Sequence, residues 1–234
     1  MRHRLIMGLL LAPSVSAAAQ VGYLPSQSPF HELTIGTYFE VTGGHVFGSG
    51  GLLDLGPRNG ASEGLSLVVR GNHALQFSFG LWTAGTERTW IDAYDSVATR
   101  NKGLVPQRLI AGEFGMQLNT TGGKRWHALA PYAGVSVGLV NGAASPPTDT
   151  SGYSFGTKLF FAPTLGTRLF VGQRLYLKLD VRALVWNLQY PPSYALEPAK
   201  QPGTTASPNA VNPTGVASQY TITPEIRVGL GIHW

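Results

Sequence analysis

Apolar and polar residues alternate along the C-terminal stretch of the chain. From Tyr220 to Trp234 every even position carries an apolar or aromatic residue, and every odd position carries a polar residue or glycine. Successive side chains of a β-strand point to opposite faces, so this pattern predicts a strand with one apolar face and one polar face. The alternation leaves open whether the apolar face meets lipid or a soluble core, because both produce the same period.

Seven further stretches alternate in the same way, and together they predict an all-β chain of eight antiparallel strands. The expected ranges are 33–42, 64–70, 75–87, 108–119, 131–139, 153–171, 174–187 and 220–234. The connections between them alternate between long and short, and the long ones are 43–60, 88–104, 141–152 and 190–219. In an up-and-down barrel all long connections then fall at one end, which is typical of a transmembrane β-barrel with long outer loops.

The N-terminus has the organisation of a secretory signal peptide. Arg2 and Arg4 precede a short apolar run, and small residues follow it, so we expect residues 1–19 to be removed after Ala19. The apolar run is shorter than the ~20 residues that a membrane-spanning helix needs. Residues 20–30 are then an N-terminal lead-in, and residues 31–234 form the outer-membrane β-barrel.

Composition narrows the possible chemistry. The chain has no cysteine, which excludes disulfides, a lipid-anchored cysteine and thiolate metal sites. Asp92 and Asp95 are too few ligands for a Ca²⁺ site, so we expect no metal and no cofactor. Seventeen basic against twelve acidic residues give a net charge of +5, which falls to +3 without Arg2 and Arg4. The basic residues are scattered singly, so we expect no nucleic-acid partner.

We expect the charged residues of the predicted strands to lie on the polar face and none on the apolar face. The residues on the polar face are Glu40, Arg70, Glu113, Lys158, Arg168, Lys178, Asp180, Arg182, Glu225 and Arg227. Eight strands enclose a lumen that side chains fill, so these charges would point into a narrow interior. Because buried charge must be paired or hydrated, we predict an ion-pair network that joins several strands inside the lumen.

Pro163 interrupts this regular pattern. It lies within the predicted strand 153–171, where proline cannot donate a ladder hydrogen bond, and a closed barrel offers no free edge for it. Phe161 and Leu165 keep the same face on either side of it. We therefore expect a local bulge at Pro163 or a position above the bilayer.

Four residues at the C-terminus resemble a known assembly signal. Arg227, Gly229, Ile232 and Trp234 match the β-signal of bacterial outer-membrane proteins: a polar residue, a glycine two positions later, an apolar third-last residue and a final aromatic. The eight-strand layout is similar to the small barrels typified by the transmembrane domain of outer-membrane protein A. The resemblance implies recognition by the barrel assembly machinery and insertion into the bacterial outer membrane, among lipid and lipopolysaccharide. We expect a monomer.

The sequence leaves several functions open. One is a non-enzymatic barrel with a side-chain-filled lumen, structural or acting through surface loops, although the proline-rich loop 190–219 is expected to be solvated rather than packed. A narrow pore for small solutes or ions is the first alternative. An enzyme that modifies lipid A is the second, with His45 expected in an outer loop near Ser49 and Asp54. A catalytic triad needs mutual geometry, so chance proximity is the simpler interpretation.

Overall fold

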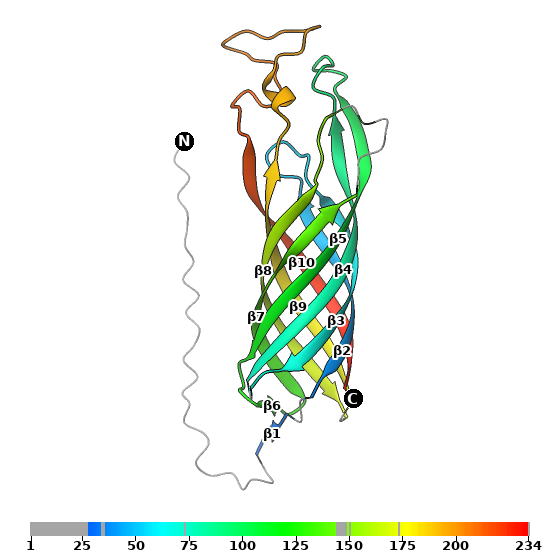
Figure 1. Ribbon diagram of the computed structural model, residues 1–234, viewed down its shortest axis with the longest axis vertical. Coiled ribbons are helices and arrows are strands. Elements are labelled where there is room, and N and C mark those ends of the chain that lie inside the picture. The colour runs from blue at the N-terminus through cyan, green and yellow to red at the C-terminus, as the bar shows by residue number, and fades with distance from the viewer. Residues whose placement is uncertain are drawn as a thin grey trace.

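Eight long strands form a closed antiparallel barrel (Figure 1). The computed structural model describes residues 28–33, 36–72, 74–143, 149, 151–172 and 174–233. The barrel strands are β2 (Tyr38–Ser49), β3 (Arg58–Arg70), β4 (Leu75–Ile91), β5 (Asn101–Asn119), β7 (Leu129–Gly142), β8 (Thr157–Val171), β9 (Leu175–Gln189) and β10 (Ser218–His233). The predicted fold class is confirmed. The predicted signal peptide, most of the predicted lead-in and Trp234 lie outside the described residues.

The first and last barrel strands pair with each other and close the wall. β10 pairs with β2 from Glu225 opposite Val46 to His233 opposite Tyr38. Two short strands, β1 (Phe30–Glu32) and β6 (Lys124–Trp126), pair at the lower end of the barrel (Figure 1). A closed wall gives each barrel strand two neighbours, which a membrane-spanning sheet requires because lipid offers no hydrogen-bond partner.

The strands are staggered around the barrel. A row of directly opposed residues that starts at Thr167 on β8 returns to β8 at Thr157, ten positions along the same strand. Between these ends the row passes through Leu179, Val228, Gly43, Glu63, Thr83, Ile110 and Asn141. Such a stagger tilts eight strands against the barrel axis and leaves a lumen just wide enough for side chains.

Several strands reach further toward the outer loops than the sequence pattern predicts. β2 starts at Tyr38 and runs to Ser49, and β3 starts at Arg58, so most of the expected loop 43–60 belongs to strands. β4 and β5 likewise leave a shorter connection than the expected 88–104. The apolar alternation stops before the strands do, because outward residues above the hydrocarbon layer need not be apolar.

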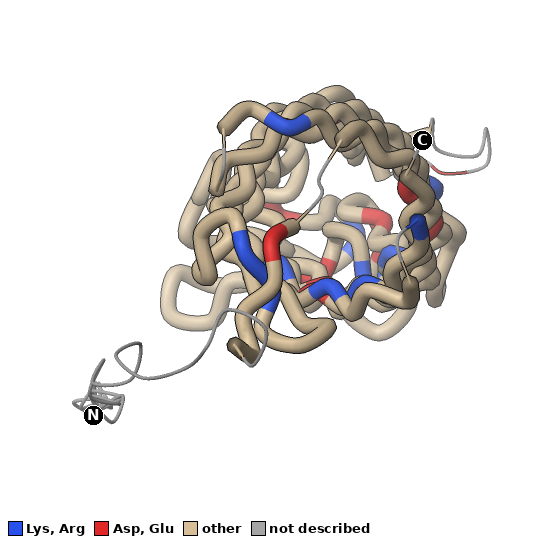
Figure 2. The backbone as a smooth tube through the Cα atoms, turned by 90° about the horizontal axis from the view of Figure 1, so that it is seen from below, with Lys and Arg blue, Asp and Glu red and all other residues tan. Residues whose placement is uncertain are grey.

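The outer wall carries a belt of exposed apolar side chains. Examples from seven strands are Val41, Leu65, Phe79, Phe114, Leu139, Leu165 and Leu179. A soluble monomer does not expose a continuous belt of this kind, whereas a barrel in a membrane must. Viewed from the lower end, the chain forms a closed ring with charged positions distributed around it (Figure 2). No helix in the described part of the chain is long and apolar enough to cross a bilayer.

The barrel interior is layered. The lower cluster is formed by Leu33, Tyr38, Val68, Ala130 and Tyr176. The upper apolar layer includes Val46, Trp82, Leu109, Val140, Phe160, Leu184 and Trp186. The inward positions of β9 follow the same order, with Tyr176 at the bottom, Lys178, Asp180 and Arg182 in the middle, and Leu184 and Trp186 above them. A charged layer therefore lies between two apolar ones.

Pro163 sits in the barrel wall without a bulge. It faces outward within β8 and lies opposite Val135 of β7. On the other side, the β8–β9 ladder skips Ala162 and Pro163 and resumes in the same register. The expectation of a bulge or of a position above the bilayer is therefore wrong. Proline has no N–H to offer β9, and the wall tolerates this local gap because the neighbouring pairs hold the register.

Candidate functional site in the lumen and its loops

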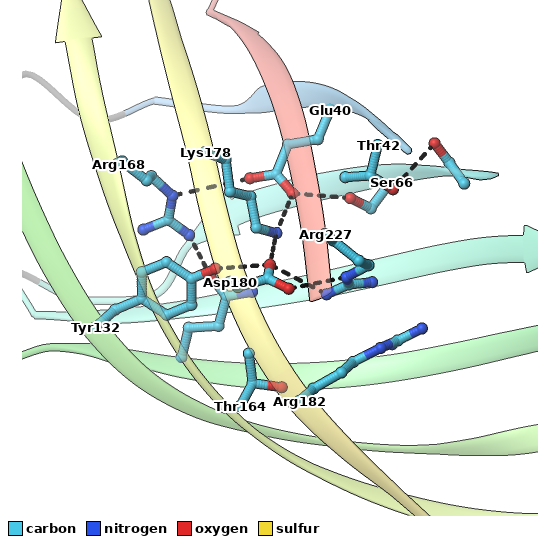
Figure 3. Close-up of polar contacts among 12 residues, drawn as sticks. Glu40, Thr42, Ser66, Tyr132, Thr164, Arg168, Lys178, Asp180, Arg182 and Arg227 are labelled. Carbon is cyan, nitrogen blue, oxygen red and sulfur yellow. Dashed lines mark hydrogen bonds and ion pairs between the residues drawn. The ribbon is translucent and has the colours of Figure 1, made fainter. Parts of the chain in front are cut away.

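Glu40 and Asp180 organise the lower half of the charged layer (Figure 3). Lys178 Nζ lies 2.8 Å from Glu40 Oε2 and 3.2 Å from Asp180 Oδ2, so one ammonium group joins two carboxylates. Arg168 Nε approaches Glu40 Oε1 at 3.8 Å, and Arg227 Nε donates to Asp180 Oδ1 at 2.9 Å. These residues come from β2, β8, β9 and β10, so the contacts connect strands that are far apart in the sequence.

Tyrosine hydroxyls complete the hydrogen bonding of these carboxylates. Tyr176 donates to Glu40, and Tyr132 donates to Asp180 Oδ2 at 3.0 Å. The guanidinium carbon of Arg168 lies 4.3 Å from the centre of the Tyr132 ring, which places this buried cation over an aromatic face. The two tyrosines point inward at predicted strand positions, but sequence reasoning missed them because it considered charged side chains alone.

Arg182 organises the upper half of the charged layer. Its Nη1 lies 2.7 Å from Glu113 Oε2, and its Nε donates to Glu225. Ser62 Oγ donates to Glu225 Oε1 at 2.6 Å. Arg227 Nη1 lies 3.7 Å from Glu113 Oε1 and so connects the upper half to the lower half.

The ion-pair network contains equal numbers of acidic and basic side chains. Its acids are Glu40, Glu113, Asp180 and Glu225, and its bases are Arg168, Lys178, Arg182 and Arg227. Equal numbers matter because each buried charge needs a partner to offset its desolvation. The structure thus brings eight of the ten sequence-predicted residues into one balanced cluster across the lumen.

The other two predicted residues lie elsewhere. Arg70 is exposed at the lower end of β3. Lys158 is buried near the upper end of β8, with its Nζ 5.3 Å from the centre of the Phe155 ring. No ion pair among the described residues joins it to the network. Phe160, the next inward residue on β8, belongs to the apolar layer that separates them.

The expectation that no charge falls on the apolar face is wrong. Glu63, Glu87 and Arg108 are exposed on the outer face of β3, β4 and β5. Glu63 belongs to a strand because β3 starts at Arg58 rather than at the predicted position 64. Arg108 Nε lies 3.3 Å from Thr83 Oγ1 on the same outer face. The upper part of the wall from β3 to β5 is therefore more polar on its outside than the rest of the belt.

Loop side chains close the outer end of the lumen. Tyr194, from the 3-10 helix η2 (Pro192–Ala195), is fully buried in the upper apolar layer, and its hydroxyl donates to the carbonyl of Ile91 at 2.8 Å. The backbone N–H of Asn212 donates to the Tyr194 carbonyl at 2.7 Å. The expectation that the proline-rich loop is merely solvated is therefore wrong, because one aromatic side chain anchors it to the barrel interior.

A buried ion pair ties a second loop to the barrel. Arg88, at the upper end of β4, pairs with Asp149 from the β7–β8 connection, and both side chains are 1% exposed. The Arg88 guanidinium carbon lies 5.2 Å from the centre of the Tyr153 ring. Burial opposes ionisation of Asp149, but hydrogen bonds from Ser151 and Arg88 outweigh it and hold the pKa of this carboxyl below its ordinary value.

The three residues considered for lipid A chemistry do not form a catalytic group. His45 lies in β2 rather than in a loop, is exposed on the outer face, and has its ring centre 4.8 Å from that of Phe47. The carboxylate of Asp54 accepts hydrogen bonds from Arg58 at 2.7 Å and from Thr89 at 2.9 Å. The Asp54 carboxylate is therefore hydrogen-bonded to Arg58 and Thr89. No hydrogen bond among the described residues connects Asp54 to His45 or Ser49.

The residues that resemble the C-terminal β-signal differ in their surroundings. Arg227 belongs to the ion-pair network, and Ile232 is exposed on the outer face. Gly229 lies against Thr42 of β2, where a Cβ would be 2.8 Å from Thr42 Cγ2. Trp234 lies outside the described residues.

Two solved structures are similar to this chain. Neisserial surface protein A, from Neisseria, is 14% identical, with a TM-score of 0.53, and the match covers 86% of this chain and 98% of that protein. The outer membrane protein OprG from Pseudomonas aeruginosa is 12% identical, with a TM-score of 0.46 and coverage of 88% and 98%. No protein-family model and no curated protein matches the sequence. The likeness to Neisserial surface protein A, the closed wall and the apolar belt together show that this chain folds as a small eight-stranded β-barrel with an apolar outer face.

Proposed function

We propose that the protein is a non-enzymatic, non-conducting barrel that acts through its folded outer loops. The observation that supports a non-conducting barrel is the continuous filling of the lumen by side chains. The balanced ion-pair network spans the middle, and Trp82, Phe160 and Trp186, each at most 5% exposed, fill the space above it. Tyr194 then covers the outer end. Charged side chains that are fixed by one another and covered by aromatic rings leave no continuous water path.

Planar-bilayer recording tests the closed lumen. We expect no steady conductance from the purified protein. The matched variant is Trp186→Ala with Phe160→Ala, which removes two rings above the network and should permit brief, small openings at most, because the ion pairs below remain. Stable, ion-selective conductance from the unmodified protein would instead make the narrow pore its function.

Contacts between two outer loops support the loop-mediated role. Arg100 donates to the carbonyl of Asn209 at 2.8 Å, and the backbone N–H of Val97 donates to Gln201 Oε1 at 3.2 Å. The β4–β5 connection and the long loop between β9 and β10 therefore form one joined surface. Tyr94 and Leu196 on this surface are 61% and 60% exposed, and exposed apolar groups on ordered loops suit the binding of another macromolecule.

Cell-surface assays test this loop surface. Cells that display the protein should aggregate or adhere to an apolar surface more than cells without it, and Tyr94→Ser with Leu196→Ser should abolish the difference. Val171→Ser is the matched control, because Val171 is 54% exposed but lies at the inner end of the barrel. An equal loss in both variants would contradict a loop-mediated role.

We further propose that the barrel is monomeric, surrounded by lipid and lipopolysaccharide, and inserted by the barrel assembly machinery. Heat-modifiable gel migration of the membrane fraction would report the folded monomer. Truncation of the chain before Arg227 should prevent insertion, because it removes the end of the strand that pairs with β2. Protease added to intact cells should cut the exposed loop at 197–207 and leave the barrel intact.

A further inference from the structure

Lys158 is a buried cation without an acidic partner. Its side chain is 9% exposed. All twelve acidic residues of the chain lie in its described part, and no ion pair joins any of them to Lys158. The network below has four acids for four bases and therefore no spare charge. A lysine that keeps its charge in such a place needs an anion or water beside it.

The barrel wall is split next to Lys158. β8 and β9 pair upward as far as Phe160 opposite Trp186. Above this point β8 continues to Thr157, paired with β7, and β9 continues to Gln189, paired with β10. The unpaired ends, residues 157–159 and 187–189, are called the β8–β9 split. Each strand keeps its other neighbour, so the split is a local separation of the wall rather than a frayed end.

A groove lies at the β8–β9 split, and both outward-facing and inward-facing residues of the wall line it. Its volume is about 480 Å³. The outer part is lined by Leu159, Phe161, Val185 and Tyr220, and the inner part by Lys158 and Phe160. Leu159 and Tyr220 are 67% and 75% exposed, so the outer part is continuous with the apolar belt. An apolar chain in the membrane can therefore lie in the groove with one end beside Lys158.

Two further donors lie in the same layer of the lumen. Trp186 and Thr221 are directly opposed on β9 and β10, and Trp186 Nε1 and Thr221 Oγ1 are buried without a hydrogen-bond partner. The ring of Phe155 contacts both Lys158 and Trp186, with centre distances of 5.3 Å to Lys158 Nζ and 5.7 Å to the indole. An indole N–H and a hydroxyl can both donate to a carboxylate, which only accepts hydrogen bonds.

We propose that the β8–β9 split binds a long-chain monocarboxylate from the outer leaflet of the membrane. The carboxylate pairs with Lys158 and accepts hydrogen bonds from Trp186 and Thr221, while the hydrocarbon chain lies in the outer part of the groove. One carboxylate supplies the single negative charge that Lys158 lacks. It is also the smallest anionic headgroup, which suits a passage between strands that remain paired below Phe160 and Trp186.

Equilibrium binding to the full protein in phosphatidylcholine nanodiscs tests this proposal. The probes are hexadecanoate and hexadecanol, which share a chain and differ in headgroup charge, with empty nanodiscs correcting for partition into lipid. Lys158→Met should weaken hexadecanoate binding by about tenfold or more, as expected for loss of a charge-assisted hydrogen bond. Hexadecanol should bind weakly to both forms. Lys158→Arg keeps the charge and should restore hexadecanoate binding.

Matched controls separate the site from general charge effects. Lys200→Met removes a loop cation that is 79% exposed and should leave hexadecanoate binding unchanged. Heat-modifiable migration verifies that each variant is folded. The proposal is overturned if Lys158→Met binds hexadecanoate as well as the unmodified protein does, or if hexadecanol binds as tightly as hexadecanoate. Tighter binding of lipid A, with displacement of hexadecanoate, would also overturn it in favour of a lipid phosphate.

Discussion

Arg227 and Asp180 lie directly opposite each other on β10 and β9, and two hydrogen bonds of 2.9 and 3.2 Å join their side chains. Arg182 and Glu225 form a second directly opposed ion pair on the same two strands. A shift of β10 by one residue would turn Glu225 and Arg227 out of the lumen, because successive side chains of a strand alternate between its two faces. Charge pairing thus adds to the hydrogen-bond ladder in fixing the register of the last strand.

Asp180→Asn should destabilise the barrel strongly. The change keeps the side-chain shape but leaves Lys178 and Arg227 without their shared carboxylate. Loss of one partner of a buried pair typically costs about 3–5 kcal/mol of unfolding free energy. Urea unfolding in phospholipid vesicles, followed by tryptophan fluorescence, measures the change. Asp95→Asn is the control, because the pair between Asp95 of the β4–β5 connection and Lys102 of β5 is partly exposed to solvent and should contribute little to stability.

Gly231→Ala should also destabilise the barrel. Gly231 lies against the Tyr176 ring, and an added Cβ would come within 2.0 Å of its Cζ atom. Tyr176 cannot move away without losing its hydrogen bond to Glu40, so we expect a loss of about 1–3 kcal/mol. Gly43→Ala on the outer face of β2 has nothing within 4 Å of the new Cβ and should be nearly neutral in the same unfolding experiment. Similar losses at both positions would show that backbone freedom, rather than the close approach to Tyr176, requires glycine.

Glu63→Leu should stabilise the barrel in a bilayer. Glu63 is exposed on the outer face of β3, two positions from the exposed Leu65 of the apolar belt. Replacing an outward carboxylate near hydrocarbon with leucine should raise the unfolding free energy by about 1 kcal/mol. Glu87→Leu is the matched change four residues before the upper end of β4 and should have a smaller effect. Equal effects in vesicles would place both carboxylates at the same membrane depth.

Acid should loosen the β7–β8 connection. The pKa of Asp149 lies below its ordinary value of 3.8, so its pairing with Arg88 contributes stability at neutral pH. This contribution is lost as the pH falls through the lowered pKa, because protonation removes the charge. The Ser151 amide, which donates to Asp149 Oδ1 at 2.9 Å, should then lose its protection from hydrogen exchange. In Asp149→Asn the protection should be low at every pH, and a pH dependence equal to that of the unmodified protein would contradict this assignment.

Most of the fold could be predicted because a membrane barrel requires a regular pattern of apolar and polar residues in the sequence. Outward residues must be apolar at every second position, and this requirement located all eight barrel strands, including Leu175–Val185 of β9. The prediction failed above the belt, where His45 and Arg58 belong to strands without that requirement. Pro163 was misjudged because a single strand's sequence does not reveal that its neighbours hold the register.

The sequence by itself determined the class of fold and the inward direction of nine charged residues, the eight of the ion-pair network and Lys158, because alternation and charge are local properties of a strand. Only the tertiary structure decided which charges meet. Lys158 and Lys178 both point inward on adjacent strands, yet Lys178 contacts Glu40 and Asp180, whereas Lys158 lies near the upper end of β8 beside the ring of Phe155. The stagger of the strands sets the height of each side chain in the lumen, and this height depends on pairing around the whole barrel rather than on neighbours in the chain.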